Sequence, residues 1–315
     1  MNTSHNMSGV LAPVVTPFRA DLQVDPDRFS SFCRWLVGQG AGLAIFGTNS
    51  EGNSLSLRER LDLLDRLLED GIDPKRMMPG TGCCSLPETV ELTRHVVRRG
   101  CGGALMLPPF FYKGVSDDGL FAYYSQVIQG VGSAGLRLYL YHIPQVSGVP
   151  ITHTLIERLI KAYPQTVVGI KDSSGDWSNT EAMLDRFPGF SVFPASEALL
   201  GKALPLGAAG CISATANIQP AAISDLIRQF GSAGDEGRQR QVSAVRALLQ
   251  AVPMIPALKY VVSKCASDDA WRTVRPPLTP LATRQGDELM DKLSQLGFTM
   301  SGLAQRASPT APSLA

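Results

Sequence analysis

Short apolar runs alternate with amphipathic segments along most of this chain. Each run is followed by a polar turn and then by apolar residues at the helical spacing of three and four. Uninterrupted apolar runs of this length are typical of parallel strands that are buried on both faces. The pattern predicts eight strands, at residues 10–15, 43–46, 77–80, 104–107, 138–141, 167–170, 190–193 and 209–213.

Helix-start signals separate these runs. Asp25 stands before Pro26, and Ser56, Ser85 and Ser178 each precede a glutamate by three residues. A serine and a glutamate at this spacing match the capping box, in which each side chain accepts a bond from a free N–H at the helix start. Helices are predicted at 26–37, after 56, at 85–99, 117–128, 154–162, after 178, after 197 and at 221–230.

Eight strand–helix units without a hairpin signal favour an α/β fold of parallel strands joined by helical crossovers. Closing such units into a (β/α)8 TIM barrel takes about 250 residues, which suits this length. An open doubly wound sheet is the alternative, but no G-x-G-x-x-G motif follows the first strand. We expect a catalytic barrel at 1–232, a C-terminal helical extension at 233–300 and a disordered tail at 301–315.

Composition narrows the classes of function. The 315 residues carry a formal net charge of +1, which gives no electrostatic reason to expect nucleic acid or an anionic membrane as a partner. No apolar run approaches the roughly 20 residues of a membrane helix, and the first residues lack signal-peptide features, so we expect a cytoplasmic protein. Six scattered cysteines without a C-x-x-C pair predict reduced thiols and no metal site.

The strand predicted at 167–170 runs directly into a lysine, Lys171. Desolvation disfavours an ammonium, so a buried lysine can supply a neutral amine that attacks a carbonyl carbon. The alternative is a lysine whose flexible side chain reaches solvent from the end of the strand. This segment alone leaves both interpretations open.

Polar residues also follow three other predicted strands. GTNSEG at 47–52 follows the second strand, PPFFYKG at 108–114 the fourth, and YHIPQVSG at 141–148 the fifth. In a barrel of this kind the carboxyl ends of all strands meet at one mouth, where active sites lie. Polar clusters at four strand ends, one of which holds the lysine, therefore favour a catalytic site over a set of ordinary turns.

Two of these clusters supply groups that suit a reactive amine. Tyr141 lies one strand–helix unit before Lys171, so its phenol is expected beside the amine, where it could move protons. Thr48 and Asn49 offer hydroxyl, amide and backbone N–H donors that could hold a carboxylate without a cation. Other interpretations are an amphipathic tyrosine at the rim and a simple tight turn.

Five segments together carry a resemblance: GVLAPVVTPF at 9–18, GTNSEG, YHIPQVSG, GIKDSSGD at 169–176 and GCISATANIQP at 210–220. They resemble the motifs of the dihydrodipicolinate synthase/N-acetylneuraminate lyase family, in register over nearly the whole barrel. The resemblance implies a (β/α)8 barrel with a C-terminal helical extension. It also implies a Schiff base between the motif lysine and pyruvate or another 2-oxo acid, without a metal or an organic cofactor.

By this resemblance Lys171 is the Schiff-base lysine, Tyr141 transfers protons, and Thr48 assists it. The family holds the carboxylate of the oxo acid at the positions of Thr48 and Asn49. Family members are commonly homotetramers, built as dimers of dimers, in which an aromatic residue reaches the neighbouring subunit's site; here that residue is Phe111 or Tyr112. Further substrate contacts are expected from Ser173, Ile212, the backbone of Ala195, and Glu197.

Three departures from the motifs bear on the substrate. Asn49 and Ser173 resemble 4-hydroxy-2-oxoglutarate aldolases more than synthases. Dihydrodipicolinate synthases carry an arginine two residues after Pro144, and here that residue is Val146, which cannot bind a carboxylate. Glu197 could hold the hydroxyls of a sugar acid, or could be a first-turn carboxylate facing a helix dipole.

The sequence thus predicts a class I aldolase-type lyase that cleaves or forms a 4-hydroxy-2-oxo acid, of the 4-hydroxy-2-oxoglutarate or 2-oxo-3-deoxy sugar acid type. A dihydrodipicolinate synthase is the nearest alternative, and a dehydratase acting on a 2-oxo-3-deoxy sugar acid is a further one. A catalytically silent barrel that binds a 2-oxo acid is the alternative from another class. Intact Lys171 and Tyr141 argue against the silent barrel, because a silent member need keep neither residue.

Overall fold

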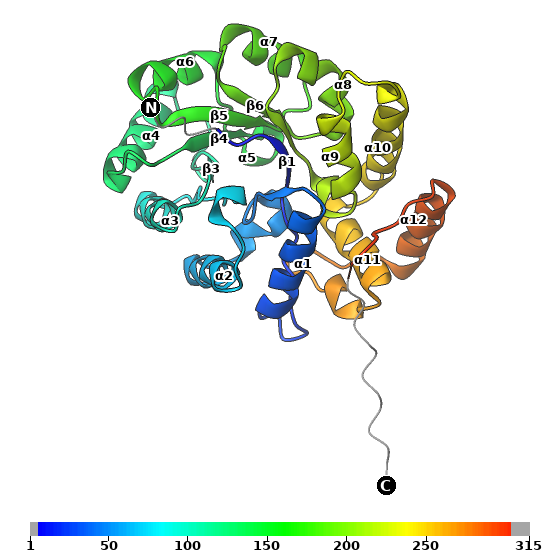
Figure 1. Cartoon of the computed structure of the whole chain (residues 1–315). Coiled ribbons are helices and arrows are strands. Elements are labelled where there is room, and N and C mark those ends of the chain that lie inside the picture. The colour runs from blue at the N-terminus through cyan, green and yellow to red at the C-terminus, as the bar shows by residue number, and fades with distance from the viewer. Residues whose placement is uncertain (1–5, 304–315) are drawn as a thin grey trace.

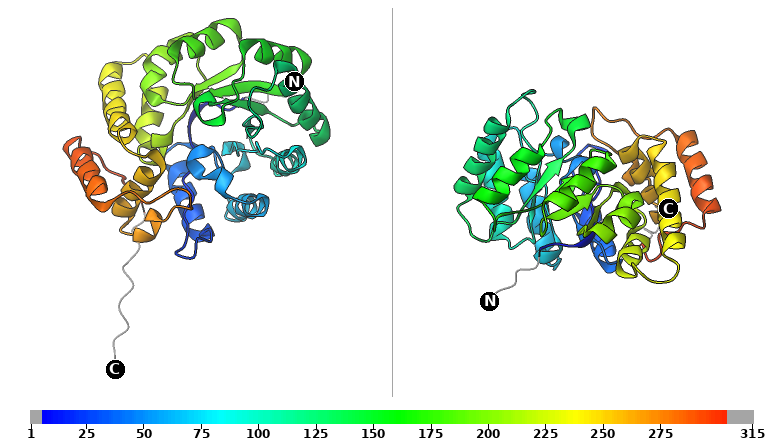
Figure 2. Two further views of the ribbon diagram at one scale, coloured as in Figure 1. Left: turned by 180° about the vertical axis from the view of Figure 1, so that it is seen from behind. Right: turned by 90° about the horizontal axis from the view of Figure 1, so that it is seen from above.

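Parallel strands form a closed barrel with helices around it in the computed structural model, which describes residues 6–303 (Figures 1 and 2). This is the predicted (β/α)8 barrel with additional C-terminal helices. The labelled strands are β1 (Gly9–Ala12), β2 (Gly42–Leu43), β3 (Ala104–Met106), β4 (Leu138–His142), β5 (Val167–Asp172), β6 (Ser191–Pro194) and β7 (Gly210–Ile212).

Two runs of parallel strands make up the barrel wall, in the orders β2-β1-β7 and β3-β4-β5-β6. The strand predicted at 77–80 joins them through single bridges, from Met77 to β2 and from Gly80 to β3. Pro79 lies between these bridges and has no N–H to donate, which explains why the ladder is interrupted there. On the opposite side the backbone amide of Ala209 donates to the carbonyl of Val192 at 3.0 Å, which links β6 to β7.

The helices around the barrel follow the predicted order. They are α1 (Pro26–Gly38), α2 (Leu57–Glu69), α3 (Leu86–Arg98), α4 (Asp117–Val131), α5 (Pro144–Ser147), α6 (His153–Ala162), α7 (Trp177–Arg186), α8 (Leu200–Ala203) and α9 (Pro220–Arg228). Beyond them α10 (Asp235–Gln250), α11 (Met254–Ala266) and α12 (Thr283–Gln295) lie together at one side of the barrel (Figure 1). We call residues 233–300, which contain these three helices, the C-terminal extension.

The helix caps test the predicted start signals. The Ser56–Glu59 capping box is confirmed, with both reciprocal bonds formed at the start of α2. The box predicted at Ser178 is wrong. The N-cap of α7 is Asp176, whose carboxylate accepts a bond from the Ser178 amide at 2.9 Å, so the helix begins at Trp177. Aspartate caps a helix as well as serine does, and here it stands two residues earlier.

Large side chains fill the barrel interior. Gly103 and Gly169 admit the ring of Tyr139, since a Cβ atom at either glycine would lie 2.5 or 2.6 Å from that ring. The Tyr139 hydroxyl in turn accepts a bond from the Met7 amide at 2.8 Å. Strand residues two apart share a face, so Tyr141 also points into the barrel, nearer the carboxyl end of β4.

Ser301, close to the last described residue, contacts α1 of the barrel. The carbonyl of Ser301 accepts bonds from the indole of Trp35 at 3.0 Å and from the amide of Gln39 at 3.2 Å. Most of the tail predicted to be disordered, residues 304–315, lies outside the described residues. Among residues 6–303 no single helix is long and apolar enough to cross a membrane. Taken together, α10 and α11 have the length and composition of a membrane span, but they are bent by 113° where they meet.

Candidate active site

The carboxyl ends of β4 and β5 place the predicted tyrosine and lysine opposite each other. In this parallel pair Tyr141 is in register with Lys171, and His142 with Asp172. Successive strand residues face opposite sides, so Tyr141 and Lys171 point into the barrel while His142 and Asp172 face the surrounding helices. The strand continues through Asp172, one residue beyond the expected lysine terminus, and Lys171 is only 2% exposed. The sequence left open whether this lysine reaches solvent, and the structure buries it.

A chain of polar groups connects the amine to the turn after β2. The Lys171 Nζ donates to the Tyr141 hydroxyl at 3.3 Å and lies 4.3 Å from the centre of that ring. The Tyr141 hydroxyl also shares a hydrogen bond with Thr48 Oγ1 at 3.0 Å. The three side chains predicted to be catalytic therefore meet, although Thr48 stands 93 residues before Tyr141 in the sequence and Tyr141 stands 30 before Lys171. Such a chain could carry a proton to and from the amine.

Thr48 and Asn49 stand at the start of a short 3-10 turn, Thr48–Ser50, which follows Gly47. The Ser50 amide is the first to donate back within this turn, to the Gly47 carbonyl at 3.1 Å. The N–H groups at the start of a helical turn have no partner inside it. Thr48 and Asn49 also line a hollow of about 370 Å³ together with residues 253–256 and 277–279 of the C-terminal extension. Neither Lys171 nor Tyr141 lines this hollow.

Three more predicted residues lie at the same end of the barrel. Ile212 ends β7 and belongs to the same apolar cluster inside the barrel as Tyr141. The Ala195 amide donates to the carbonyl of Asp172 at 2.8 Å, directly beyond β6. Ser173 follows Asp172, so alternation gives it the same side of the chain as Lys171. All three therefore lie at or just beyond the carboxyl ends of their strands, as Lys171 does.

Glu197 was also expected to contact the substrate, but its carboxylate is bound by other side chains of the protein. Its side chain is 0% exposed, and its two oxygens accept hydrogen bonds from Ser213, Thr215 and Gln219. Arg246 of α10 lies 3.7 Å from the same carboxylate. Protein donors occupy both oxygens, so we assign Glu197 a role in holding the loops after β6 and β7 together, in place of the expected substrate contact.

The two candidate aromatic residues are both on the surface. Phe111 and Tyr112 are each 73% exposed, and their rings form an edge-to-face pair with centres 5.3 Å apart. The neighbouring Lys113 fixes their loop, because its Nζ donates to the carbonyl of Ser147 at 2.6 Å. Val146, on the same short helix α5 as Ser147, is 62% exposed. This exposed surface is available to a second subunit.

A buried polar cluster behind Lys171 was not foreseen from the sequence. The carboxylate of Asp172 accepts bonds from Thr180 at 2.6 Å and Asn179 at 3.1 Å, which ties β5 to α7. His142 accepts a bond at Nδ1 from the Ile151 amide at 3.0 Å, and burial lowers its pKa, so the ring stays neutral with its proton on Nε2. The sequence did carry a signal for this cluster. Lys171 and Asp172 are consecutive strand residues, so their side chains point to opposite sides of the strand.

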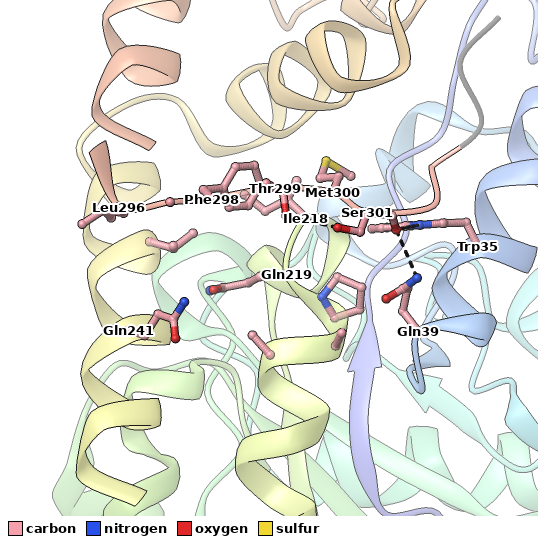
Figure 3. A pocket seen from close by; sticks show the side chains of 15 residues that line it. Trp35, Gln39, Ile218, Gln219, Gln241, Leu296, Phe298, Thr299, Met300 and Ser301 are labelled. Atoms are coloured by element: carbon pink, nitrogen blue, oxygen red, sulfur yellow. Dashed lines mark hydrogen bonds between the residues drawn. The ribbon is translucent and has the colours of Figure 1, made fainter. Parts of the chain in front are cut away.

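A separate hollow of about 210 Å³ lies between α1, α9, α10 and the segment after α12 (Figure 3). Gln39, Gln219, Phe298 and Ser301 are among its lining residues, and the hydrogen bond from Gln39 to Ser301 crosses one edge. None of the predicted catalytic residues lines it. Among residues 6–303 no group of three or more His, Cys, Asp or Glu side chains could hold a metal ion.

Comparison with known proteins agrees with the fold. The model of the dihydrodipicolinate synthetase family matches residues 6–296. The chain belongs to this family. Members are lyases of the class I aldolase type that bind pyruvate as a Schiff base on a lysine, without a metal cofactor, so this family member is an enzyme of that broad class.

Individual relatives in the dihydrodipicolinate synthetase family carry several names. The chain is 34% identical to an uncharacterised DapA-like lyase of Chloroflexus aurantiacus, over 88% of this chain and 93% of the relative. It is 31% identical to a 4-hydroxy-tetrahydrodipicolinate synthase of Thermus thermophilus, over 86% of this chain and 91% of that relative.

Two crystal structures show the same fold with a TM-score of 0.84 each. One is dihydrodipicolinate synthase of Agrobacterium tumefaciens, which is 31% identical and is matched over 91% of this chain and 99% of that one. The other is YagE, a prophage protein of E. coli K12 in complex with pyruvate, which is 26% identical and is matched over 92% and 99%.

Proposed function

We propose that this family member is an aldolase that cleaves, and in reverse forms, a 4-hydroxy-2-oxo acid. The observation that carries the proposal is the buried hydrogen-bonded chain from Lys171 through Tyr141 to Thr48. It joins a nucleophilic amine, a proton carrier and a carboxylate-binding turn in one place. These are the three parts that imine-based cleavage of an oxo acid requires.

Lys171 is the proposed nucleophile. Its amine attacks the C2 carbonyl of the oxo acid, and loss of water leaves an imine. When the substrate's 4-hydroxyl gives up its proton, the C3–C4 bond breaks, the aldehyde leaves and the electron pair enters the imine to form an enamine. Protonation at C3 and addition of water then release pyruvate and free the amine. No redox step is involved.

Tyr141 and Thr48 are proposed to move the protons of these steps. The Tyr141 hydroxyl lies between the amine and the Thr48 hydroxyl, at 3.3 and 3.0 Å, so a proton can pass along the chain in either direction. Thr48 and Asn49 would hold the substrate's carboxylate, and Ile212 would pack against its methyl side. Ser173 and the backbone of Ala195 would complete the imine site.

The absence of an arginine on α5 supports an aldolase over a synthase. A synthase must bind the carboxylate of aspartate semialdehyde, and each charge-assisted hydrogen bond from an arginine contributes about 1.5–3 kcal/mol. Val146 is 62% exposed on α5 and has no donor to give. Ser173 offers a hydroxyl, which suits the hydroxylated tail of a sugar acid or the aldehyde of a shorter product.

Dihydrodipicolinate synthase is the second candidate, and a specific observation favours it. The relative from Thermus thermophilus, at 31% identity, is named a 4-hydroxy-tetrahydrodipicolinate synthase. In that case an arginine from another part of the chain or from a neighbouring subunit would replace the donor missing at Val146.

A product screen with the purified protein separates the two candidates. We expect cleavage of short 4-hydroxy-2-oxo acids to pyruvate, together with weak or absent condensation of pyruvate with aspartate semialdehyde. Efficient dihydrodipicolinate formation would reject the aldolase proposal in favour of the synthase. Failure to form any borohydride-trapped imine with pyruvate would leave the silent barrel as the better description.

Oligomerisation is part of the proposal. Large exposed aromatic side chains are typical of interfaces, where they supply much of the binding energy. Phe111 and Tyr112 present such a pair beside the exposed Val146, at the same end of the barrel as the proposed site. We propose a homo-oligomer, either a dimer or a homotetramer built as a dimer of dimers, in which one of these rings reaches the partner's site.

A further inference from the structure

A second buried lysine within residues 6–303, Lys259, lies on α11 of the C-terminal extension and is 0% exposed. It forms an ion pair with Glu51, whose side chain is also fully buried, and donates to the carbonyl of Thr273 at 2.8 Å. Burial lowers the pKa of Lys259 to about 8, which leaves the amine charged at neutral pH. The other oxygen of Glu51 accepts from the Arg275 amide at 2.9 Å, so the extension satisfies both oxygens of this carboxylate.

Glu51 is the residue that closes the turn proposed to bind the substrate's carboxylate. Its amide donates to the carbonyl of Thr48 at 3.1 Å. Its backbone lies in the left-handed region with φ of 54°, as does that of Phe46 with φ of 63°. A side-chain-bearing residue keeps such a conformation only where its surroundings enforce it, and this is common at functional sites.

The extension holds the same turn at further points. The guanidinium of Arg275 donates to the carbonyl of Ser54 at 2.6 Å and pairs with Glu59 at the start of α2. Lys259 and Arg275 both lie over the ring of Phe18, at 4.4 and 4.6 Å from its centre. The segment from Gly47 to α2 is therefore fixed by the extension instead of by the barrel alone.

We propose that the Lys259–Glu51 ion pair is a positioning device, through which the C-terminal extension sets where the Thr48–Asn49 turn presents its donors to the carboxylate of the oxo acid. The proposal rests on the function proposed above. A continuous set of contacts runs from Lys259 through Glu51 and Thr48 to Tyr141 and Lys171. Loosening the ion pair would shift the carboxylate-binding turn while the imine-forming lysine stays in its strand.

The test compares two carbonyl compounds that differ in the carboxylate. Pyruvate carries it, and hydroxyacetone has a hydroxymethyl group in its place. Each is incubated with the full-length protein and borohydride, which reduces an imine to a stable secondary amine, and the mass gained is followed against concentration. In Lys259→Met we expect half-maximal trapping to need about 10- to 100-fold more pyruvate, because a turn displaced by about 1 Å can cost that much. Trapping by hydroxyacetone should be unchanged.

Lys264→Met is the matched control. Lys264 lies on the same helix, but it pairs with Asp287 on the surface, with side chains 40% and 52% exposed. This variant should behave as wild type with both compounds. The double variant with Glu51→Gln and Lys259→Met removes both charges, so no unpaired carboxylate is left buried and folding is restored. It should still need more pyruvate.

Equal pyruvate dependence in wild type and the folded double variant would overturn the positioning role. An equal loss of trapping with pyruvate and hydroxyacetone would also overturn it, since that result indicates general damage to the site. If wild type itself gives no adduct with pyruvate, the proposed aldolase function fails first, and the inference that rests on it fails as well.

Discussion

Among residues 6–303 two lysines are buried, Lys171 in the barrel and Lys259 in the C-terminal extension, and the partners of their amines differ. Lys171 is 2% exposed, and its Nζ donates to the hydroxyl of Tyr141. Lys259 is 0% exposed, and its Nζ meets the carboxylate of Glu51. Tyr141 can exchange a proton with the amine of Lys171, as imine formation requires, whereas the carboxylate of Glu51 and the carbonyl of Thr273 hold Lys259 in a structural ion pair. Burial alone therefore does not identify a catalytic lysine; its partner does.

The largest expected effect comes from removing the amine of Lys171. Lys171→Met should abolish both the pyruvate adduct and turnover, while the free energy of unfolding should not fall, because no buried carboxylate is left unpaired. Product formation and chemical denaturation of the same preparation measure the two quantities. Turnover close to that of the wild type would show that Lys171 is not the nucleophile. Lys171→Arg should be as inactive as Lys171→Met, because a guanidinium stays protonated.

Removing the phenol next to Lys171 should have a smaller effect on turnover. Tyr141→Phe keeps the ring that packs inside the barrel and deletes only the hydroxyl between Lys171 and Thr48. We expect kcat to fall by about 10²–10⁴-fold, the usual contribution of a positioned acid–base group. Steady-state kinetics with a 4-hydroxy-2-oxo acid give the value. A near-normal kcat, with chemistry shown to be rate-limiting, would assign the proton to another group.

Removing Lys259, the lysine paired with Glu51, should lower the free energy of unfolding, unlike the removal of Lys171. Lys259→Met leaves Glu51 charged and buried, which typically costs about 3–5 kcal/mol. Lys264→Met removes an exposed ion pair with Asp287 and a contact with the ring of Tyr260, 5.2 Å from the amine, and exposed ion pairs contribute about 0–1 kcal/mol. Urea denaturation of both variants measures the difference. Equal stability of the two would contradict the structural role assigned to Lys259.

Acid should weaken the contact between the extension and α2. The hydrogen bond from Arg275 lowers the pKa of Glu59 in the folded protein. Its stabilisation is therefore complete above the unfolded pKa of about 4.3 and is lost as pH falls through the lower folded value. Glu59→Gln should lower the Tm at neutral pH, and the gap to wild type should close as pH falls below 4.3, as calorimetry would show. A difference in Tm between Glu59→Gln and wild type that stays constant down to the lowest pH at which the protein folds would contradict this stabilisation by Glu59.

The sequence predicted those parts of the fold that depend on residues close together along the chain. The strand sites, the order of the helices and the Ser56–Glu59 capping box follow from periodicity and from residues that lie close together in sequence. The cap of α7 was misplaced because Asp176 and Ser178 are both good caps, and only the backbone conformation selects between them.

The candidate site divides in the same way. Lys171 and Tyr141 could be found because they end neighbouring strands, and strand ends meet at the barrel mouth. The pair of Glu51 and Lys259 could not, because 208 residues separate them and nothing in the helical pattern of α11 marks one lysine as buried. Glu197 illustrates the same limit. Its position after β6 suggested a substrate contact, but Ser213, Thr215 and Gln219 of the segment after β7 donate to its oxygens.

The most direct test of the account is to locate the imine. The wild-type protein is incubated with pyruvate and borohydride, digested, and the modified peptide is sequenced by mass spectrometry. We predict a single reduced pyruvyl group on Lys171, with Lys259 unmodified although it is equally buried. A pyruvyl group on Lys259 or on any other lysine, with Lys171 unmodified, would contradict the claim that the partner of a buried lysine decides its chemistry.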